Sequence, residues 1–231
     1  MKKILLSLAV AIASVGVSLP THAAKSANLT IKGQITPPAC DLSFTDARVD
    51  FGTHAFRSLN IDGTILPTQT TTLNLTCSGA TRVSFSAADN RPGSAIAAGD
   101  VTNWPNLATL GGTTTIWGLG MTGTADAKIG GLEIVIDPNQ ARIDGAPTSS
   151  DLRFISGALG QNTWSGNFYM SSANLSPNVQ YSFGSSQEGP RAVSNVSVPL
   201  KLAAVIARPA SLPADDEINL DGSLTFSLHY L

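Results

Sequence analysis

The apolar residues of this chain recur in short segments in which they alternate with polar residues, and this period constrains the fold more than any other feature. Leu224, Phe226, Leu228 and Tyr230, for example, alternate with Ser, Thr and His up to the last residue. A period of two is typical of a β-strand that packs one face on a core. The same pattern, or a short apolar run between turn residues, predicts strands at 29–35, 49–52, 72–77, 82–86, 115–121, 132–136, 153–155, 180–183, 193–206 and 224–231.

Turn residues separate these segments, and no long segment has the 3.6-residue apolar period of a helix. Many short strands between Gly, Pro, Asn and Asp turns predict an all-β fold, a sandwich of the immunoglobulin type. Pro199 lies inside the segment 193–206. Because proline lacks the N–H that a strand ladder uses, we expect that segment to be an edge strand or two strands with a break.

The first 23 residues have the composition of a secretory signal. Lys2 and Lys3 precede a mostly apolar run from Ile4 to Leu19, and Ala23 ends a plausible cleavage site. A membrane anchor is the alternative, but the run is shorter than the roughly 20 apolar residues that span a bilayer and contains three serines and a glycine. We therefore expect an exported protein that begins at Ala24 after cleavage.

The charge of the chain argues against a nucleic-acid partner. Without Lys2 and Lys3, 12 Lys and Arg face 16 Asp and Glu, which moves the formal net charge from -2 to -4, and no basic cluster is present. Charged residues make up 13% of the chain, which suits an exported β-protein better than a cytosolic enzyme. No phosphate loop or other cofactor motif occurs, so we expect no small-molecule cofactor.

The chain has two cysteines, Cys40 and Cys77. In an exported protein an isolated pair is most simply a disulfide. Two free buried thiols are the alternative.

Catalytic motifs are scarce. A histidine-based mechanism in the exported chain has only His54 and His229 to use, and no nucleophile elbow or zinc-protease motif is present. The acidic run Asp215 to Glu217 lacks the spacing of a calcium loop, so a solvated turn is the better interpretation. We therefore do not expect an enzyme and assign no catalytic or metal-binding residue.

Three tryptophans could contact a sugar or another ligand. Large aromatic side chains are mostly buried, so core packing or loop anchoring is the better expectation for each. They are Trp104, Trp117 and Trp164.

The two ends of the exported chain both look like strands at free termini. Ala27, Leu29 and Ile31 share one parity near the N-terminus, and the run 224–231 ends the chain. Both strands could lie inside one complete sandwich. Alternatively, the sandwich lacks a strand beside the terminal one and leaves an apolar groove for another polypeptide.

The ends resemble those of chaperone-usher pilus subunits of Gram-negative bacteria. The resemblance rests on ANLTIKGQITPPAC (27–40), VDFG (49–52), TLNLTC (72–77) and the terminal strand with Gly222 and the penultimate Tyr230. GLGMTG (118–123), KIGGLEIVI (128–136) and INLDGSLTFSLHYL (218–231) resemble, more specifically, an uncharacterised family of fimbrial-subunit-like secreted proteins.

This resemblance implies an incomplete immunoglobulin-like, pilin-type β-sandwich that lacks its last strand. A periplasmic chaperone would lend the missing strand, and at an outer-membrane usher the N-terminal extension of a neighbouring fimbrial subunit would replace it. The donor residues would be Ala27, Leu29 and Ile31, and the disulfide would join Cys40 to Cys77. The strand that faces the chaperone would carry Gly222, Leu224, Phe226, Leu228 and Tyr230.

We therefore expect a signal peptide at 1–23, an N-terminal extension and start of the first strand at 24–36, and a pilin-like domain at 37–231. The expected function is that of a structural subunit of a surface fimbria, which passes through the periplasm and contributes to adhesion. The alternative is a tip adhesin or glycan-binding module that uses the Gly/Thr-rich middle, residues 87–131, and its tryptophans.

Overall fold

The computed structural model describes residues 26–35, 38–110, 114–122, 126–214 and 217–231. The chain divides into two units, Met1–Thr36 and Pro37–Leu231. In the first unit, residues 26–35 form no strand, and their side chains are exposed, with Leu29 and Ile31 each 87% exposed. The prediction of a strand at 29–35 is therefore wrong for the chain by itself, because alternation supplies a strand face but no hydrogen-bonding partner.

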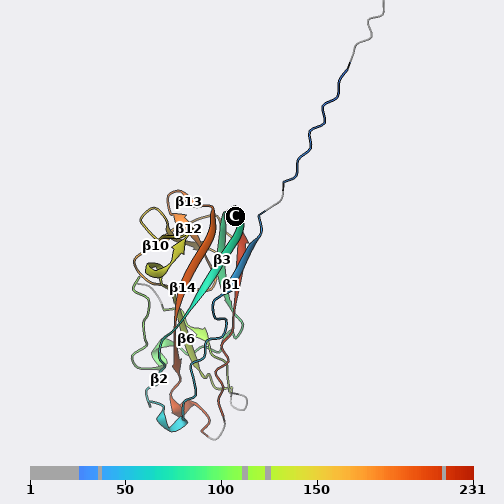
Figure 1. Cartoon of the computed structure of the whole chain (residues 1–231). Helices are drawn as coiled ribbons and strands as arrows, with labels where there is room; N and C mark the ends of the chain where they lie inside the picture. Colours follow the sequence, from blue (N-terminus) through green and yellow to red (C-terminus); the bar gives the residue numbers. More distant parts are fainter. Residues whose placement is uncertain (1–25, 36–37, 111–113, 123–125, 215–216) are drawn as a thin grey trace, which may run out of the picture. The chain divides into compact units, whose positions relative to one another are not determined.

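The second unit contains two antiparallel sheets, which we call sheet A and sheet B. The central path of sheet A runs β1-β3-β14-β6-β11, and shorter strands pair with β14, β6 and β7. Figure 1 shows β1, β3 and β14 beside one another. The strands of sheet A are β1 (Cys40–Phe44), β2 (Thr64–Ile65), β3 (Gln69–Thr81), β5 (Trp117–Gly118), β6 (Gly130–Ile136), β7 (Arg142–Ile143), β8 (Ala146–Pro147), β11 (Ala173–Asn174) and β14 (Val193–Ile206).

Sheet B runs β10-β9-β12-β4-β15, with β13 paired to β12. Short 3-10 turns connect some of the strands, and no α-helix occurs among the residues that the structure describes. The strands of sheet B are β4 (Val83–Asp89), β9 (Arg153–Ala158), β10 (Gly166–Phe168), β12 (Val179–Ser185), β13 (Gly189–Pro190) and β15 (Leu224–Tyr230). The 3-10 turns are η1 (Phe56–Ser58), η2 (Ala98–Asp100), η3 (Pro138–Gln140) and η4 (Pro209–Ser211).

The core lies between the two sheets. Sheet B contributes a group of stacked and edge-on aromatic rings: Phe85, Phe154, Phe168, Tyr181 and Phe183. Sheet A contributes aliphatic side chains from its central strands: Leu73, Leu75, Ile134, Ile136, Val198 and Leu200. The all-β, two-sheet fold class predicted from the sequence is therefore confirmed, as is the Cys40–Cys77 disulfide.

Three further strand predictions need correction. Of the predicted strand at 115–121, only Trp117–Gly118 forms a strand, β5. Residues 49–52 form no strand, because the Asp50 carboxylate accepts a hydrogen bond from the Gly52 amide and turns the chain there, with Gly52 at a φ of 80°. Residues 193–206 form one continuous strand, β14, at the centre of sheet A and not at an edge.

Pro199 fits the middle of a central strand because its missing N–H falls where β14 changes its neighbour. On one side β14 pairs with β7 at Val196 and Ser197, and with β6 from Leu200 onward. The Pro199 carbonyl accepts a hydrogen bond from the Asp137 amide at this junction. Since the N–H and C=O of a strand residue point to the same side, the proline removes no bond of the β3 ladder.

The middle of the chain covers the outer face of sheet A. Side chains of Ile96, Trp104 and Ile116 pack against Gly131 of β6, where a larger residue would leave them no room. Glu133, also on β6, is fully buried beneath this cover. Its carboxylate accepts hydrogen bonds from Trp104 Nε1 (3.0 Å) and from the Leu107 and Ala108 amides (2.9 and 3.3 Å). No helix in the described part of the chain is long and apolar enough to cross a membrane.

A candidate strand-binding groove

Two strands of the second unit have one unpaired edge. Among the described residues, β1 pairs only with β3, at the end of sheet A, and β15 pairs only with β4, at the end of sheet B. An unpaired edge exposes backbone N–H and C=O groups that another strand can use. Each sheet therefore ends in a strand that can accept a partner.

The inward side chains of these two strands are only partly buried. They alternate with exposed Ser, Thr and Asp residues, as expected for strands with one face on the core, but none is buried as deeply as the central strands. The partly buried residues are Leu42 and Phe44 of β1, and Leu224, Phe226 and Leu228 of β15. Apolar side chains that face the core and still contact solvent mark an incompletely filled space between the sheets.

That space is a groove with an apolar floor. A cavity of about 260 Å³ is floored by Leu132 and Ile134 of β6 and by Leu200 and Leu202 of β14. Its walls come from both edge strands and the segments next to them: Phe44, Val49 and Phe51 on one side, and Leu220, Gly222, Leu224 and Phe226 on the other.

A second cavity of about 570 Å³ continues the groove away from β15. It shares Val49, Phe51 and Leu220 with the first cavity, and it extends to Phe56, Leu59 and Ile218. The groove therefore extends beyond the paired part of β15, along residues 217–223, which form no strand.

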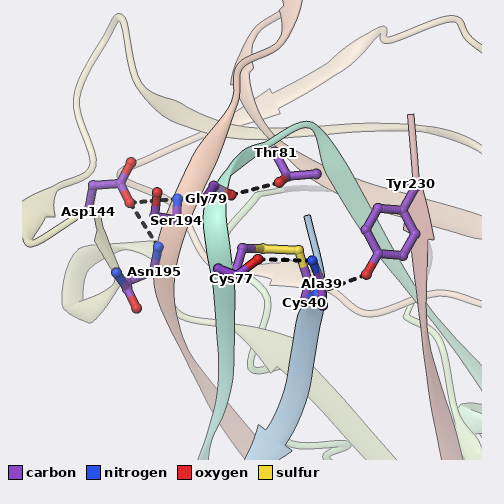
Figure 2. Close-up of a disulfide and its surroundings, with 10 residues drawn as sticks. Ala39, Cys40, Cys77, Gly79, Thr81, Asp144, Ser194, Asn195 and Tyr230 are labelled. Carbon is purple, nitrogen blue, oxygen red and sulfur yellow. Dashed lines mark hydrogen bonds between the residues drawn. A yellow bond between two sulfur atoms is a disulfide. The ribbon is translucent and has the colours of Figure 1, made fainter. Parts of the chain in front are cut away.

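Near the disulfide the two walls of the groove touch. The Tyr230 hydroxyl accepts a hydrogen bond from the Cys40 amide at 2.8 Å, and Figure 2 shows this contact beside the Cys40–Cys77 bridge. The rings of Phe44 and Phe226 meet edge to face, with centroids 5.0 Å apart. These two contacts close the groove at one end and leave its other end open.

The structure gathers the residues predicted for the chaperone-facing strand along one wall. Gly222 lines the groove, Leu224, Phe226 and Leu228 face inward, and Tyr230 is 56% exposed apart from its bonded hydroxyl. Their contact with a chaperone stays a prediction.

Ala27, Leu29 and Ile31 lie in the first unit, and their role as donor residues also stays a prediction. Sequence reasoning missed Phe44 as a wall residue, although the alternation in Cys40–Phe44 carries the signal.

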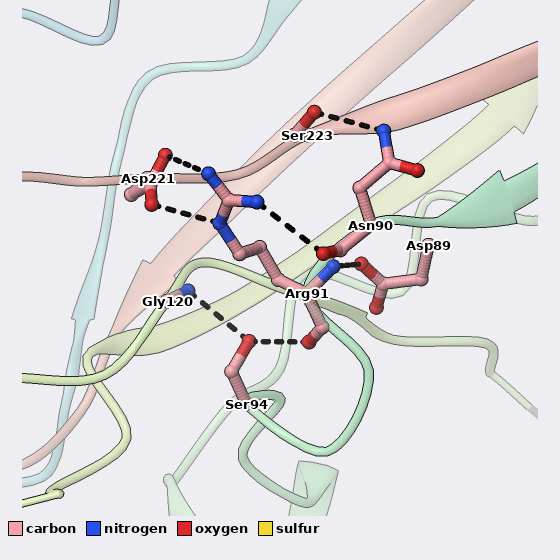
Figure 3. Close-up of polar contacts among 7 residues, drawn as sticks. All are labelled: Asp89, Asn90, Arg91, Ser94, Gly120, Asp221 and Ser223. Carbon is pink, nitrogen blue, oxygen red and sulfur yellow. Dashed lines mark hydrogen bonds and ion pairs between the residues drawn. The ribbon is translucent and has the colours of Figure 1, made fainter.

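Polar contacts hold residues 217–223, the wall at the open end of the groove, in place. Arg91 binds Asp221 through both carboxylate oxygens, with Nε to Oδ2 at 2.8 Å and Nη2 to Oδ1 at 2.9 Å (Figure 3). The neighbouring Asn90 donates two hydrogen bonds to Ser223, from its backbone amide to the Ser223 carbonyl and from its side-chain amide to Ser223 Oγ. The Asp221 amide donates to the Leu119 carbonyl at 2.9 Å.

The hydrogen bonds from Arg91 lower the pKa of the Asp221 carboxyl below its ordinary value of 3.8, and the same contact raises the pKa of Arg91. A lowered carboxyl pKa stabilises the folded state at any pH above the ordinary value. That contribution is lost as the pH falls through the lowered pKa. The ion pair is therefore intact at neutral pH.

The histidines and tryptophans have structural contacts. His229 Nε2 hydrogen-bonds to Ser86 Oγ, and His54 Nε2 to the Phe51 carbonyl. Trp117 lies in the core, as expected, and is 1% exposed. Trp104 is bound to Glu133, and Trp164 Nε1 donates to Asn162. Within the described ranges, no group of three or more His, Cys, Asp or Glu is arranged to hold a metal ion.

Similarity is found to a curated protein and to a solved structure. It is 29% identical to Protein GltF of Escherichia coli (strain K12) over 223 residues, which cover 88% of this chain and 87% of GltF. The crystal structure of the P pilus rod subunit PapA matches 83% of this chain and 99% of its own length, at 15% identity and a TM-score of 0.28. At that score the likeness is too distant for a comparison of the two folds.

Residues 29–133 match the sequence pattern of a family described as a protein of unknown function (DUF1120). This segment contains in full three of the stretches that carry the expected resemblance: VDFG, TLNLTC and GLGMTG. The similarity to this uncharacterised family, expected from the sequence, is thereby confirmed.

Proposed function

We propose that this protein is a structural subunit of a surface fimbria, assembled by the chaperone-usher route. In this proposal the groove between β1 and β15 accepts a strand from another polypeptide. The observation that carries it is the groove itself, whose walls are two edge strands with inward, partly exposed apolar side chains. Main-chain hydrogen bonds from an added strand would give affinity, and side-chain pockets would give specificity.

The energy of filling such a groove is large. Burying three aliphatic side chains of an incoming strand contributes about 6 kcal/mol, at roughly 2 kcal/mol each. This is comparable to the whole stability of a typical domain. An unfilled groove with two free strand edges also favours aggregation. We therefore infer that a periplasmic chaperone occupies the groove first, and that a neighbouring fimbrial subunit replaces it at the outer-membrane usher.

The donor of the final strand is the N-terminal segment of a neighbouring copy or subunit. Ala27, Leu29 and Ile31 share one parity. The side chains of residues 26–35 are exposed, and these residues form no strand. A segment of this kind supplies an alternating apolar face without first breaking a strand of its own. The subunit would travel through the periplasm and reach the cell surface in the assembled fimbria, where it contributes to adhesion.

The structure offers the glycan-binding alternative fewer groups than the sequence suggested. Trp117 is buried, and Trp104 is committed to the Glu133 carboxylate. The Gly/Thr-rich middle also packs on sheet A through Ile96, Trp104 and Ile116. These contacts explain Trp104 and Trp117 by packing, and they favour the structural subunit over the tip adhesin.

A peptide-binding experiment tests the proposal. A fluorescent peptide of residues 26–35 should bind the full chain, and Leu29→Asp with Ile31→Asp in the peptide should abolish binding, because in this proposal both side chains enter the groove. On the protein, Leu224→Asp should also abolish binding, because Leu224 lines the groove cavity. The matched control is Ser227→Asp in the same strand, whose side chain is exposed. Equal binding by Leu224→Asp and Ser227→Asp would refute the proposed groove.

A further inference from the structure

The wall of the open half of the groove has no strand ladder to keep it straight. Residues 217–223 line both cavities through Ile218, Leu220 and Gly222, but β15 begins only at Leu224. An incoming strand that extends past Leu224 needs this segment to be extended and fixed, because main-chain hydrogen bonds require a regular partner. Something other than a ladder must therefore fix it.

A rigid turn opposite this wall supplies the fixed point. The Asp89 carboxylate accepts hydrogen bonds from the Arg91 amide at 2.8 Å and from the Gly118 amide at 3.0 Å. Ser94 Oγ donates to the Arg91 carbonyl at 2.7 Å and accepts from the Gly120 amide at 3.1 Å. Figure 3 shows Arg91 extending from this turn to Asp221. The backbone of Arg91 is thus locked before its side chain reaches the wall.

Two further features make Asp221 the attachment point of the wall. Its amide donates to the Leu119 carbonyl, so its backbone is also anchored. Gly120 has a φ of 90°, and a side chain there would lie 3.1 Å from Asp221 Cβ, so the glycine lets the wall approach. The Arg91 fork then fixes the direction of the carboxylate, which a single-point contact would leave free to rotate.

We propose that the Arg91–Asp221 ion pair is a clip that positions the open wall of the groove, residues 217–223, for pairing with an incoming strand. This role rests on the proposed function. Arg91 and Asp221 are positioning residues, because their contact fixes the backbone that the partner strand would meet. The side chains of the pair are 40% and 59% exposed, so the clip is sensitive to salt while the core is not.

The test measures peptide affinity together with local backbone protection. The peptide covers residues 26–35 with Lys32→Gln and blocked termini, so that it carries no charge of its own. Asp221→Asn and Arg91→Gln should each weaken binding by up to about fivefold, the upper end for an exposed charge pair. The Asp221 amide, which donates to the Leu119 carbonyl, and the Asn90 amide, which donates to the Ser223 carbonyl, should exchange faster in both variants. The wild-type affinity should fall with added sodium chloride, and the variant affinities should not.

Two matched variants separate positioning from a general loss of charge or stability. Asp151→Asn removes a carboxylate from the turn before β9, which lines neither groove cavity, and should bind like the wild type. The exchange Arg91→Asp with Asp221→Arg restores an ion pair and should recover most of the affinity. A purely structural contact would shift the unfolding midpoint and leave the affinity of the folded protein unchanged.

The outcomes distinguish the two proposals. If the wild type binds the peptide and both single variants bind equally well, the clip is overturned and the groove stands. If the wild type does not bind, the groove fails and the positioning role fails with it. Unchanged amide exchange in Asp221→Asn would overturn the clip whatever the peptide does.

Discussion

At the scale of single residues, buried polar groups organise the parts of this protein that alternation does not describe. Glu133 is fully buried on β6 and accepts three hydrogen bonds from the segment 104–108. Burying a carboxylate is unfavourable unless such donors surround it. The contact therefore fixes the covering segment on sheet A at one point, and it explains why a charged residue interrupts an otherwise apolar strand.

Replacing Glu133 should destabilise the second unit. Glu133→Gln keeps the shape but places an amide donor against Trp104 Nε1 or the Leu107 amide, so at least one buried donor loses its partner. The expected cost is about 1–3 kcal/mol in the free energy of unfolding, measured by denaturant titration. Trp104→Phe is the control, since it removes one donor and keeps most of the ring. A Glu133→Gln variant as stable as the wild type would contradict this account.

At the scale of elements, the sequence predicted strands well where alternation or an apolar run coincided with a hydrogen-bonded neighbour. Thr72–Cys77 lies in β3, Leu132–Ile136 in β6 and Leu224–Tyr230 forms β15. The strand prediction for residues 49–52 is wrong because the hydrogen bond between the Asp50 carboxylate and the Gly52 amide competes with strand pairing.

The prediction of an edge or a break at Pro199 is wrong because β14 changes its pairing partner there, from β7 to β6. This change is a property of the assembled sheet and not of the segment. The same limit applies to the groove. Leu224, Phe226 and Leu228 could be named from the alternation of their own segment, whereas Arg91 and Asp221 are far apart in sequence and meet only in the fold.

Tyr230 of β15 offers a prediction at this scale. Tyr230→Phe removes the oxygen that accepts the Cys40 amide hydrogen bond, so the start of β1 should loosen. The free energy of unfolding should fall by about 0.5–1.5 kcal/mol, and the Cys40 amide should exchange its hydrogen faster. Tyr169→Phe, whose ring lies under Arg153 and away from the groove residues, is the matched control. Unchanged exchange at Cys40 would show that the hydroxyl contact does not hold the two walls together.

At the scale of the whole second unit, the disulfide anchors β1, a strand that contributes both to the stability of the unit and to one wall of the groove. Cys40 and Cys77 are opposite each other in the register of β1 and β3. β1 has five residues and one paired edge among the described residues, so few other contacts hold it on sheet A. The same strand supplies Phe44, a wall of the groove. The disulfide therefore secures an edge strand that would otherwise fray.

Removing the disulfide should lower stability and disable the groove together. The bridge joins residues 37 apart in sequence, and closing a loop of this length contributes about 4 kcal/mol in the chain-entropy model. Cys40→Ser with Cys77→Ser should lower the free energy of unfolding by that amount. Under conditions where this variant remains folded, it should bind the peptide of residues 26–35 more weakly than the wild type, because the β1 wall frays first. Reduced wild-type protein is the control, and it should match the double variant in both measurements. A double variant that loses stability but keeps the full affinity would show that β1 holds its place without the bridge, and that the groove does not depend on it.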